Sequence, residues 1–194
     1  MAHFTDVYYA ALPEVMGRRA IYPPERESYI LQANHPTLMR QRYYVWLLLE
    51  YAVEQAFSKN LAQMQLYSTT RGVWKSPFGY FSLSHSHNAI AVAVSDMPVG
   101  VDIQQRIEKT TVANYALNTA EWSHFLSSQC PNELLTELWT KKECLFKTTD
   151  LPRFIPKDVD TAKTFTQTVW LDGLDGAYAL SVSSPARIIQ KINL

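Results

Sequence analysis

The segment Phe81–Gln104 constrains the fold of this chain more than any other, with the sequence FSLSHSHNAIAVAVSDMPVGVDIQ. Ala89–Val94 is a short apolar run with β-branched residues, which is typical of a strand buried on both faces. Ser95–Pro98 carries turn-forming residues, and Val99–Ile103 resumes a strand. We therefore predict a strand, a polar loop, a second strand, a tight turn and a third strand.

The third strand contains one charged residue, Asp102, between Val101 and Ile103. Burying a lone carboxylate is costly unless a cation meets it. A metal ion, an arginine or a lysine could each supply that positive charge. The residues around Asp102 do not decide between these three, so the rest of the chain has to be searched for the partner.

Length and composition exclude several classes of protein. A chain of 194 residues can form one sizeable core or two small halves packed together. Its formal net charge of zero gives no argument for a nucleic-acid partner. We see neither a secretory signal nor an apolar stretch long enough to span a bilayer. The two cysteines, Cys130 and Cys144, are interpreted as reduced thiols, so we expect a cytoplasmic protein away from the membrane.

Hydrophobic spacing predicts two long helices, Thr37–Phe57 and Pro131–Lys147. Shorter helices are expected at Glu25–Ala33 and at Asn118–Leu126. We expect an edge strand at Phe4–Leu12, a strand at Leu61–Tyr67, a loop at Arg71–Tyr80, and strands at Thr164–Leu171, Gly176–Val182 and Arg187–Ile192.

Each half of the chain thus holds one long helix and several strands. This pattern favours the α+β class, built as a pseudo-dimer of two similar lobes, each with a long helix packed on a small antiparallel sheet. We place the N-terminal lobe at 1–98 and the C-terminal lobe at 99–194.

The second long helix carries a row of functional side chains. Trp139, Glu143 and Lys147 are spaced four residues apart and share one face. Lys142 falls within the apolar stripe, where its amine must reach solvent or meet an anion. A surface ion pair of Glu143 and Lys147 is the structural alternative. Asp102 and Glu143 together offer two carboxylates, and Lys142 and Lys147 flank them. Such a set suits a magnesium ion that obtains its remaining ligands from a diphosphate.

These residues resemble the paired signature of the 4′-phosphopantetheinyl transferases, in their larger, surfactin-synthetase-activating type. The resemblance lies in Val99–Ile103, in Leu138–Glu143 followed by Lys147, and in Phe81–Ser86, with Lys75 and Pro77 upstream. The resemblance implies a monomeric enzyme of the holo-[acyl-carrier-protein] synthase type. It would transfer the phosphopantetheine arm of coenzyme A to a serine of an acyl or peptidyl carrier protein and release 3′,5′-ADP.

The resemblance also implies roles for individual residues. Asp102 and Glu143 correspond to Mg²⁺ ligands, Glu143 and Lys147 to groups that act on the reacting atoms, and Glu121 to a family acid that acts in catalysis. Residues implied in coenzyme A binding are Arg26, Arg40, Lys75, Ser84, His85, Lys142 and Lys147. Gln104 stands where the family often has a further acid, so its amide oxygen would be an uncharged metal ligand.

Several alternatives stay open at this stage. Asn118 and Glu121 are spaced as a capping box, which competes with a catalytic role for Glu121. Arg40 and Arg42 lie near a helix N-terminus, where either an anion or plain solvation would explain them. The residues after Lys147 lack the family's glycine, and Tyr29 replaces a second basic residue. A coenzyme-A-binding or carrier-binding protein of the same fold, with weakened catalysis, is therefore the alternative function.

Overall fold

The computed structural model describes residues 3–17, 19–68, 73–149 and 151–191. It mixes helix and sheet, which is compatible with the α+β class. The helices are α1 (Pro24–Leu31), α2 (Pro36–Phe57), α3 (Ala113–Ala116), α4 (Thr119–Ser127) and α5 (Pro131–Phe146), with 3₁₀ turns η1 (Leu61–Met64), η2 (Thr110–Val112) and η3 (Pro156–Asp158). The strands are β1 (Thr5–Ala11), β2 (Tyr67–Ser68), β3 (Val73–Ser76), β4 (Gly79–Ser86), β5 (Ala89–Ser95), β6 (Val101–Gln105), β7 (Gln167–Leu171), β8 (Tyr178–Val182) and β9 (Arg187–Gln190).

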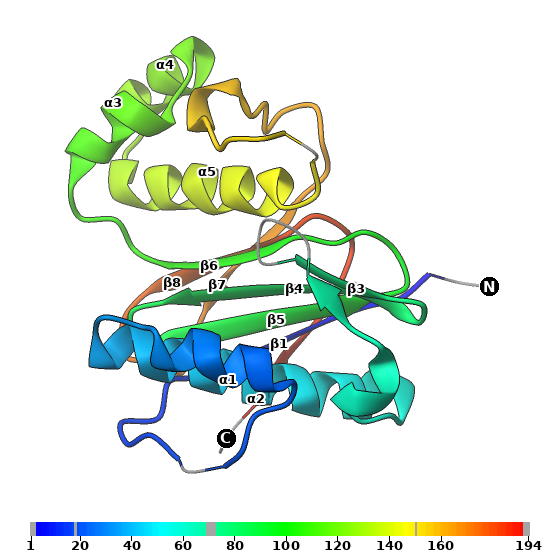
Figure 1. Cartoon of the computed structure of the whole chain (residues 1–194). Coiled ribbons are helices and arrows are strands. Elements are labelled where there is room, and N and C mark those ends of the chain that lie inside the picture. Colours follow the sequence, from blue (N-terminus) through cyan, green and yellow to red (C-terminus); the bar gives the residue numbers. More distant parts are fainter. Residues whose placement is uncertain (1–2, 18, 69–72, 150, 192–194) are drawn as a thin grey trace.

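The described strands form two sheets that lie one above the other in Figure 1. The larger has the order β2-β3-β4-β5-β1-β9, and the smaller has the order β6-β8-β7. Pairing is antiparallel except between β1 and β9, which run parallel. The last strand, β9, therefore belongs to the larger sheet, beside the first strand of the chain, β1.

Strand β5 is buried along its whole length, as its sequence predicts. Because successive side chains point to opposite faces, Ile90, Val92 and Val94 join the core beneath α2. Ala89, Ala91 and Ala93 face the other way, into the core shared with the smaller sheet. The small alanine side chains allow the second layer to approach closely.

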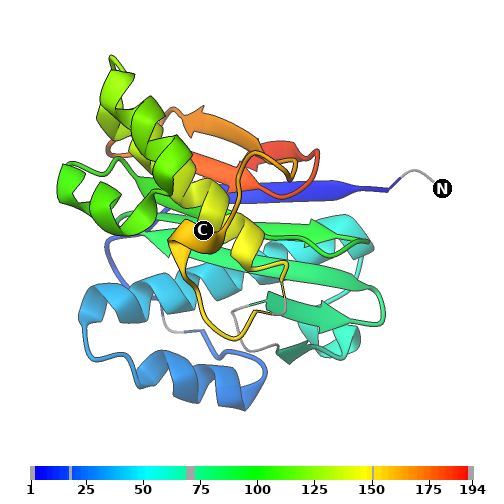
Figure 2. The same ribbon diagram turned by 90° about the horizontal axis from the view of Figure 1, so that it is seen from above.

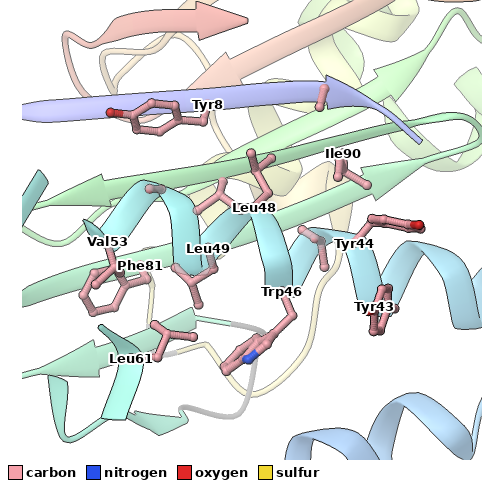
Figure 3. Close-up of a cluster of buried hydrophobic side chains, with 14 of the residues drawn as sticks. Tyr8, Tyr43, Tyr44, Trp46, Leu48, Leu49, Val53, Leu61, Phe81 and Ile90 are labelled. Carbon is pink, nitrogen blue, oxygen red and sulfur yellow. The ribbon is translucent and has the colours of Figure 1, made fainter. Parts of the chain in front are cut away.

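The core beneath the larger sheet is built around α2, which crosses the sheet face in Figure 1. Figure 3 shows Leu48 and Leu49 of this helix among the aromatic rings of the cluster. Trp46 is fully buried, and its ring centroid lies 4.8 Å from that of Trp74 in an edge-to-face arrangement. This packing fixes α2 and leaves the opposite face of the sheet for the second layer.

Helix α5 covers the smaller sheet, and α3 and α4 pack above it (Figures 1 and 2). A glycine makes this approach possible, because a Cβ placed on Gly100 would lie 2.0 Å from the backbone oxygen of Cys144. The helix that carries Glu143 and Lys147 is thereby held directly against the strand that carries Asp102. None of the described helices has the length and apolar character needed to cross a membrane.

Most predicted elements are confirmed, including the central three strands and both long helices. Three predictions are wrong. The strand at Phe4–Leu12 is not at an edge, because β9 pairs with its free side. Leu61–Met64 is a 3₁₀ turn, started by reciprocal hydrogen bonds between Asn60 and Gln63. The expected loop Arg71–Tyr80 contains β3 and the start of β4, while Arg71 and Gly72 lie outside the described residues, as does Ile192 at the end of the last predicted strand.

Candidate active site

Strands β4 and β6 meet through a row of serines. Ser82, Ser84 and Ser86 alternate along β4, so their hydroxyls share one face. Each hydroxyl oxygen accepts a backbone N–H of β6, from Val101 at 3.0 Å, Ile103 at 3.2 Å and Gln105 at 3.1 Å respectively. The serine alternation was the sequence signal for this seam, and it fixes β6 against the larger sheet.

Asp102 is buried beside this seam, and its cationic partner is a lysine. Its Oδ1 accepts the hydroxyl of Ser84 at 2.7 Å and Nζ of Lys147 at 3.1 Å. Burial raises the pKa of Asp102, while the ammonium of Lys147 and the hydroxyl of Ser84 act against that rise. Of the two side-chain cations considered from the sequence, an arginine and a lysine, the structure places a lysine beside Asp102.

The ammonium of Lys147 bridges the two strands. Besides Asp102, it donates to the carbonyl oxygens of Val101 at 2.7 Å and Leu83 at 3.4 Å. Lys147 follows directly after the last residue of α5, where its backbone N–H still bonds to the carbonyl of Glu143. The helix end and the β4–β6 seam are therefore joined at one nitrogen atom.

Glu143 lies one helical turn before Lys147 and faces the same space. Burial, together with the negative charge of Asp102, raises the pKa of Glu143 to about 7, although Lys147 opposes this. The two carboxylates line one cavity of about 300 Å³. Its complete lining is Leu83, Ser84, His85, Asp102, Ile103, Gln104, Trp139, Glu143 and Lys147.

His85 lines the same cavity, and the residue is exposed to solvent. Desolvation, with the nearby cations Lys147, Arg42 and Arg26, lowers the pKa of His85 to about 4. His85 is therefore neutral near pH 7. Lys147, Arg42 and Arg26 thus all lie close enough to His85 to disfavour its charged form.

Arg26 and Arg42 are arranged around the ring of Tyr29. The guanidinium carbon of Arg42 lies 4.0 Å from the ring centroid and that of Arg26 lies 4.7 Å from it. Their Nε atoms are buried and make no hydrogen bond within the described part of the chain. The sequence indicated an anion site at Arg40 or Arg42 because both lie near a helix N-terminus, but only Arg40 was included among the expected coenzyme A ligands.

Five predicted site residues do not line the cavity: Arg26, described above, and Lys142, Glu121, Arg40 and Lys75. Lys142 and Glu121 instead form an ion pair with 2.8 Å between Nζ and Oε2. Glu121 also completes the capping box with Asn118. Arg40 donates to the carbonyl oxygens of Pro13 and Glu14, and Lys75 lies 5.8 Å from the ring centroid of Tyr80.

Gln104 lies between this cavity and a second one. It lines both, as does Trp139. The second cavity has a volume of about 680 Å³, and its lining includes Ile107, Val112 and Tyr115. The side-chain Nε2 of Gln104 donates to the backbone oxygen of Gln105 at 3.0 Å. A space with apolar walls thus adjoins the space that holds the two acids.

The donor set fits a magnesium ion that is completed by a substrate. No group of three or more histidine, cysteine, aspartate or glutamate side chains able to hold a metal occurs among the described residues. Asp102 and Glu143 offer carboxylate oxygens and Gln104 offers an amide oxygen. Mg²⁺ takes one or two carboxylates and obtains further oxygens from phosphate and water, so these residues suit it only together with a phosphate group.

Comparison with known proteins points to a transferase. The model of the 4′-phosphopantetheinyl transferase superfamily matches residues 98–184, which is under half of the chain. The matched region contains Asp102, Glu143 and Lys147 and supports phosphopantetheinyl transfer in general. The search of curated proteins gave no significant match.

Proposed function

We propose that this protein transfers the 4′-phosphopantetheine arm of coenzyme A to a serine of an acyl or peptidyl carrier protein and releases 3′,5′-ADP. The main support is that Asp102 lines one cavity together with Glu143 and Lys147, which lie on a different element much further along the chain. The match to the superfamily over residues 98–184 supports the same reaction class. We further propose the larger, surfactin-synthetase-activating type, a monomer of two similar lobes, in the cytoplasm.

In this proposal Asp102 and Glu143 would hold a magnesium ion, with Gln104 beside them. The ion, when bound, would neutralise charge that develops on the phosphate oxygens. Lys147 supplies a second positive charge at the same place, because its ammonium already lies within the cavity. Glu143 is the acid nearest to accept the proton of the carrier serine, directly or through water.

We place the two ends of coenzyme A on opposite sides of the diphosphate. The nucleotide, with its 3′-phosphate, would lie toward His85, Arg26 and Arg42, since positive charge gathers there. The pantetheine arm would leave past Trp139 toward the cavity with apolar walls. Arg40 and Lys75 would have to leave their present contacts to reach the nucleotide.

The carrier protein is the test substrate. Purified protein, Mg²⁺ and coenzyme A should increase the mass of an apo carrier protein by one phosphopantetheinyl group. Asp102→Ala and Glu143→Ala should each abolish this transfer, whereas Lys141→Ala, a lysine of the same helix paired with Glu137, should retain it. Failure of the wild-type protein on fatty-acid, polyketide and peptide carrier proteins alike would refute the proposal.

A binding protein with weakened catalysis is the second candidate. The neutral Gln104, whose amide is turned to the backbone of Gln105, favours it, because the cavity then offers less negative charge to a metal. In that case calorimetry would show coenzyme A binding to a protein that modifies no carrier. A Gln104→Glu variant that gained transfer would identify the missing charge as the cause.

A further inference from the structure

We infer that the cavity of Asp102 and Glu143 binds a divalent cation and a diphosphate cooperatively, because Lys147 occupies Asp102 until a diphosphate draws it away. The inference deepens the proposed function, since the diphosphate would be that of coenzyme A. It concerns the order and coupling of binding, which neither the family match nor the proposed reaction specifies.

All three hydrogen-bond donors of the Lys147 ammonium are already in use. An ammonium group has three donors, and Lys147 directs Nζ to Val101, Leu83 and Asp102 at 2.7, 3.4 and 3.1 Å. Only 12% of the Lys147 side chain and 9% of the Asp102 side chain are exposed. Lys147 therefore has no donor left for a phosphate unless it gives up one of these contacts.

The charges that line the cavity disfavour the entry of either ligand alone. Among the lining residues, Asp102 and Glu143 are the acids, Lys147 is the lysine, and Gln104 is neutral. A divalent cation that enters alone competes with the ammonium for Oδ1 of Asp102. A diphosphate that enters alone meets two carboxylates, and like charges repel strongly in a space of low dielectric constant.

Both costs disappear when the two ligands enter together. The cation then compensates Asp102 and Glu143, and Lys147 is free to move toward the phosphate oxygens. By linkage, each ligand must raise the affinity for the other by the same factor, which is typically about 5- to 150-fold for coupled sites. The Lys147 contact that must break is the one at 3.1 Å to Asp102, because the cation then takes the place of the ammonium on Oδ1.

The first measurement uses Mn²⁺ alone, counted by electron paramagnetic resonance. The wild-type protein should bind Mn²⁺ weakly, and Lys147→Met should bind it at least about fivefold more tightly, because Asp102 has lost its competing cation. Lys141→Met, on the same helix, is the matched control and should leave Mn²⁺ affinity unchanged. A Lys147→Met protein that folds and binds Mn²⁺ no better than the wild type overturns the inference.

The second measurement changes Asp102 instead of Lys147 and follows the binding of coenzyme A without metal. Asp102→Asn keeps the shape and the acceptor for Ser84 but removes the charge that holds Lys147. In EDTA, calorimetry should show that this variant binds metal-free coenzyme A at least about fivefold more tightly than the wild type. This arm decides the matter if Lys147→Met does not fold, and equal affinities would overturn the inference.

The two proposals fail in different ways. Coupled binding of Mn²⁺ and coenzyme A without transfer to any carrier protein would count against the proposed enzyme and leave the inference standing. Transfer activity with independent binding of the two ligands would retain the enzyme and refute the coupling.

Discussion

Nζ of Lys142 lies 2.8 Å from Oε2 of Glu121, in an ion pair whose lysine is completely buried. The same ammonium donates to the carbonyl oxygens of Pro156 at 2.8 Å and Val159 at 3.0 Å. Oε1 of Glu121 accepts the hydroxyl of Thr161. The pair thus ties α4, α5 and the segment around η3 into one unit behind the cavity.

We predict that Lys142→Met destabilises the protein by about 3–5 kcal/mol, because it leaves the buried carboxylate of Glu121 without its counter-ion. Urea unfolding followed by circular dichroism measures this. Lys141→Met is the control: its amine lies 3.8 Å from Glu137 at the surface, so the loss should be about 0–0.5 kcal/mol. If Lys142→Met keeps its stability but loses affinity for coenzyme A, Lys142 binds the cofactor as the family resemblance implies.

Gly100→Ala should separate the strand of Asp102 from α5. The new Cβ would lie 2.0 Å from the Cys144 backbone oxygen, which cannot move without the helix. We expect a loss of about 1–3 kcal/mol or more in thermal or urea unfolding. Gly17→Ala is the comparison and should cost less, because its Cβ would lie 3.2 Å from the Tyr43 hydroxyl, a much milder approach than 2.0 Å to a backbone oxygen. Equal losses would show that the close contact is not the cause.

The sequence pattern predicted those features of the site that depend on one helix or one strand alone. The row of Glu143 and Lys147 follows from helical spacing, and the need of Asp102 for a cation follows from its apolar neighbours. The pairing of Lys147 with Asp102 spans two elements; the sequence indicated both residues at one magnesium site but did not predict that they contact each other. The prediction that the first strand lies at a sheet edge was wrong for a related reason, because the second partner of β1 is β9, from the far end of the chain.

The case of Lys142 shows why a burial pattern does not identify a partner. The sequence indicated that this lysine lies in the apolar stripe of α5 and needs an anion. A phosphate and the carboxylate of Glu121 would each satisfy that need, and the sequence pattern does not distinguish them. The choice depends on how α4 folds back over α5, which arises from the packing of residues such as Phe125 and Leu135 and is not encoded near Lys142.

Glu143 makes stability depend on pH in a direction that can be tested. Its pKa rises from the ordinary 4.5 to about 7 in the folded, metal-free protein. Between these values the folded state binds more protons than the unfolded state, so this group's contribution to stability falls as pH rises from 4.5 to 7. Glu143→Gln removes the ionisation, and we expect the variant to be more stable than the wild type above pH 7 by about 1–3 kcal/mol.

The difference between wild type and Glu143→Gln, measured by urea unfolding at each pH in EDTA, isolates this contribution. His85 acts in the opposite direction, because its pKa falls from the ordinary 6.5 to about 4, so its contribution to stability is lost as pH falls through that range. The His85 contribution is common to both proteins and cancels in the difference. A stability difference that does not change between pH 4.5 and 8 would contradict the raised pKa of Glu143.

Arg42→Gln tests where the nucleotide binds. Arg42 packs against Tyr29, and its Nη1 donates to the Tyr29 carbonyl oxygen at 2.9 Å, which leaves a charged group beside His85 and Arg26. If this group contacts the 3′-phosphate of coenzyme A, its loss should weaken coenzyme A binding about tenfold, as expected for a hydrogen bond between charged groups.

Dephospho-coenzyme A, which lacks the 3′-phosphate, provides the internal control for Arg42→Gln. Its affinity should be the same for the variant and the wild type, because the interaction lost in the variant is absent in both. Arg40→Gln, on the same helix, tests the other arginine implied in coenzyme A binding: because Arg40 donates to the carbonyl oxygen of Pro13, a loss of coenzyme A affinity in this variant would show that the side chain leaves that contact on binding. An equal loss of affinity for both ligands in Arg42→Gln would place the 3′-phosphate elsewhere and leave Arg42 as a structural residue that packs α1 against α2.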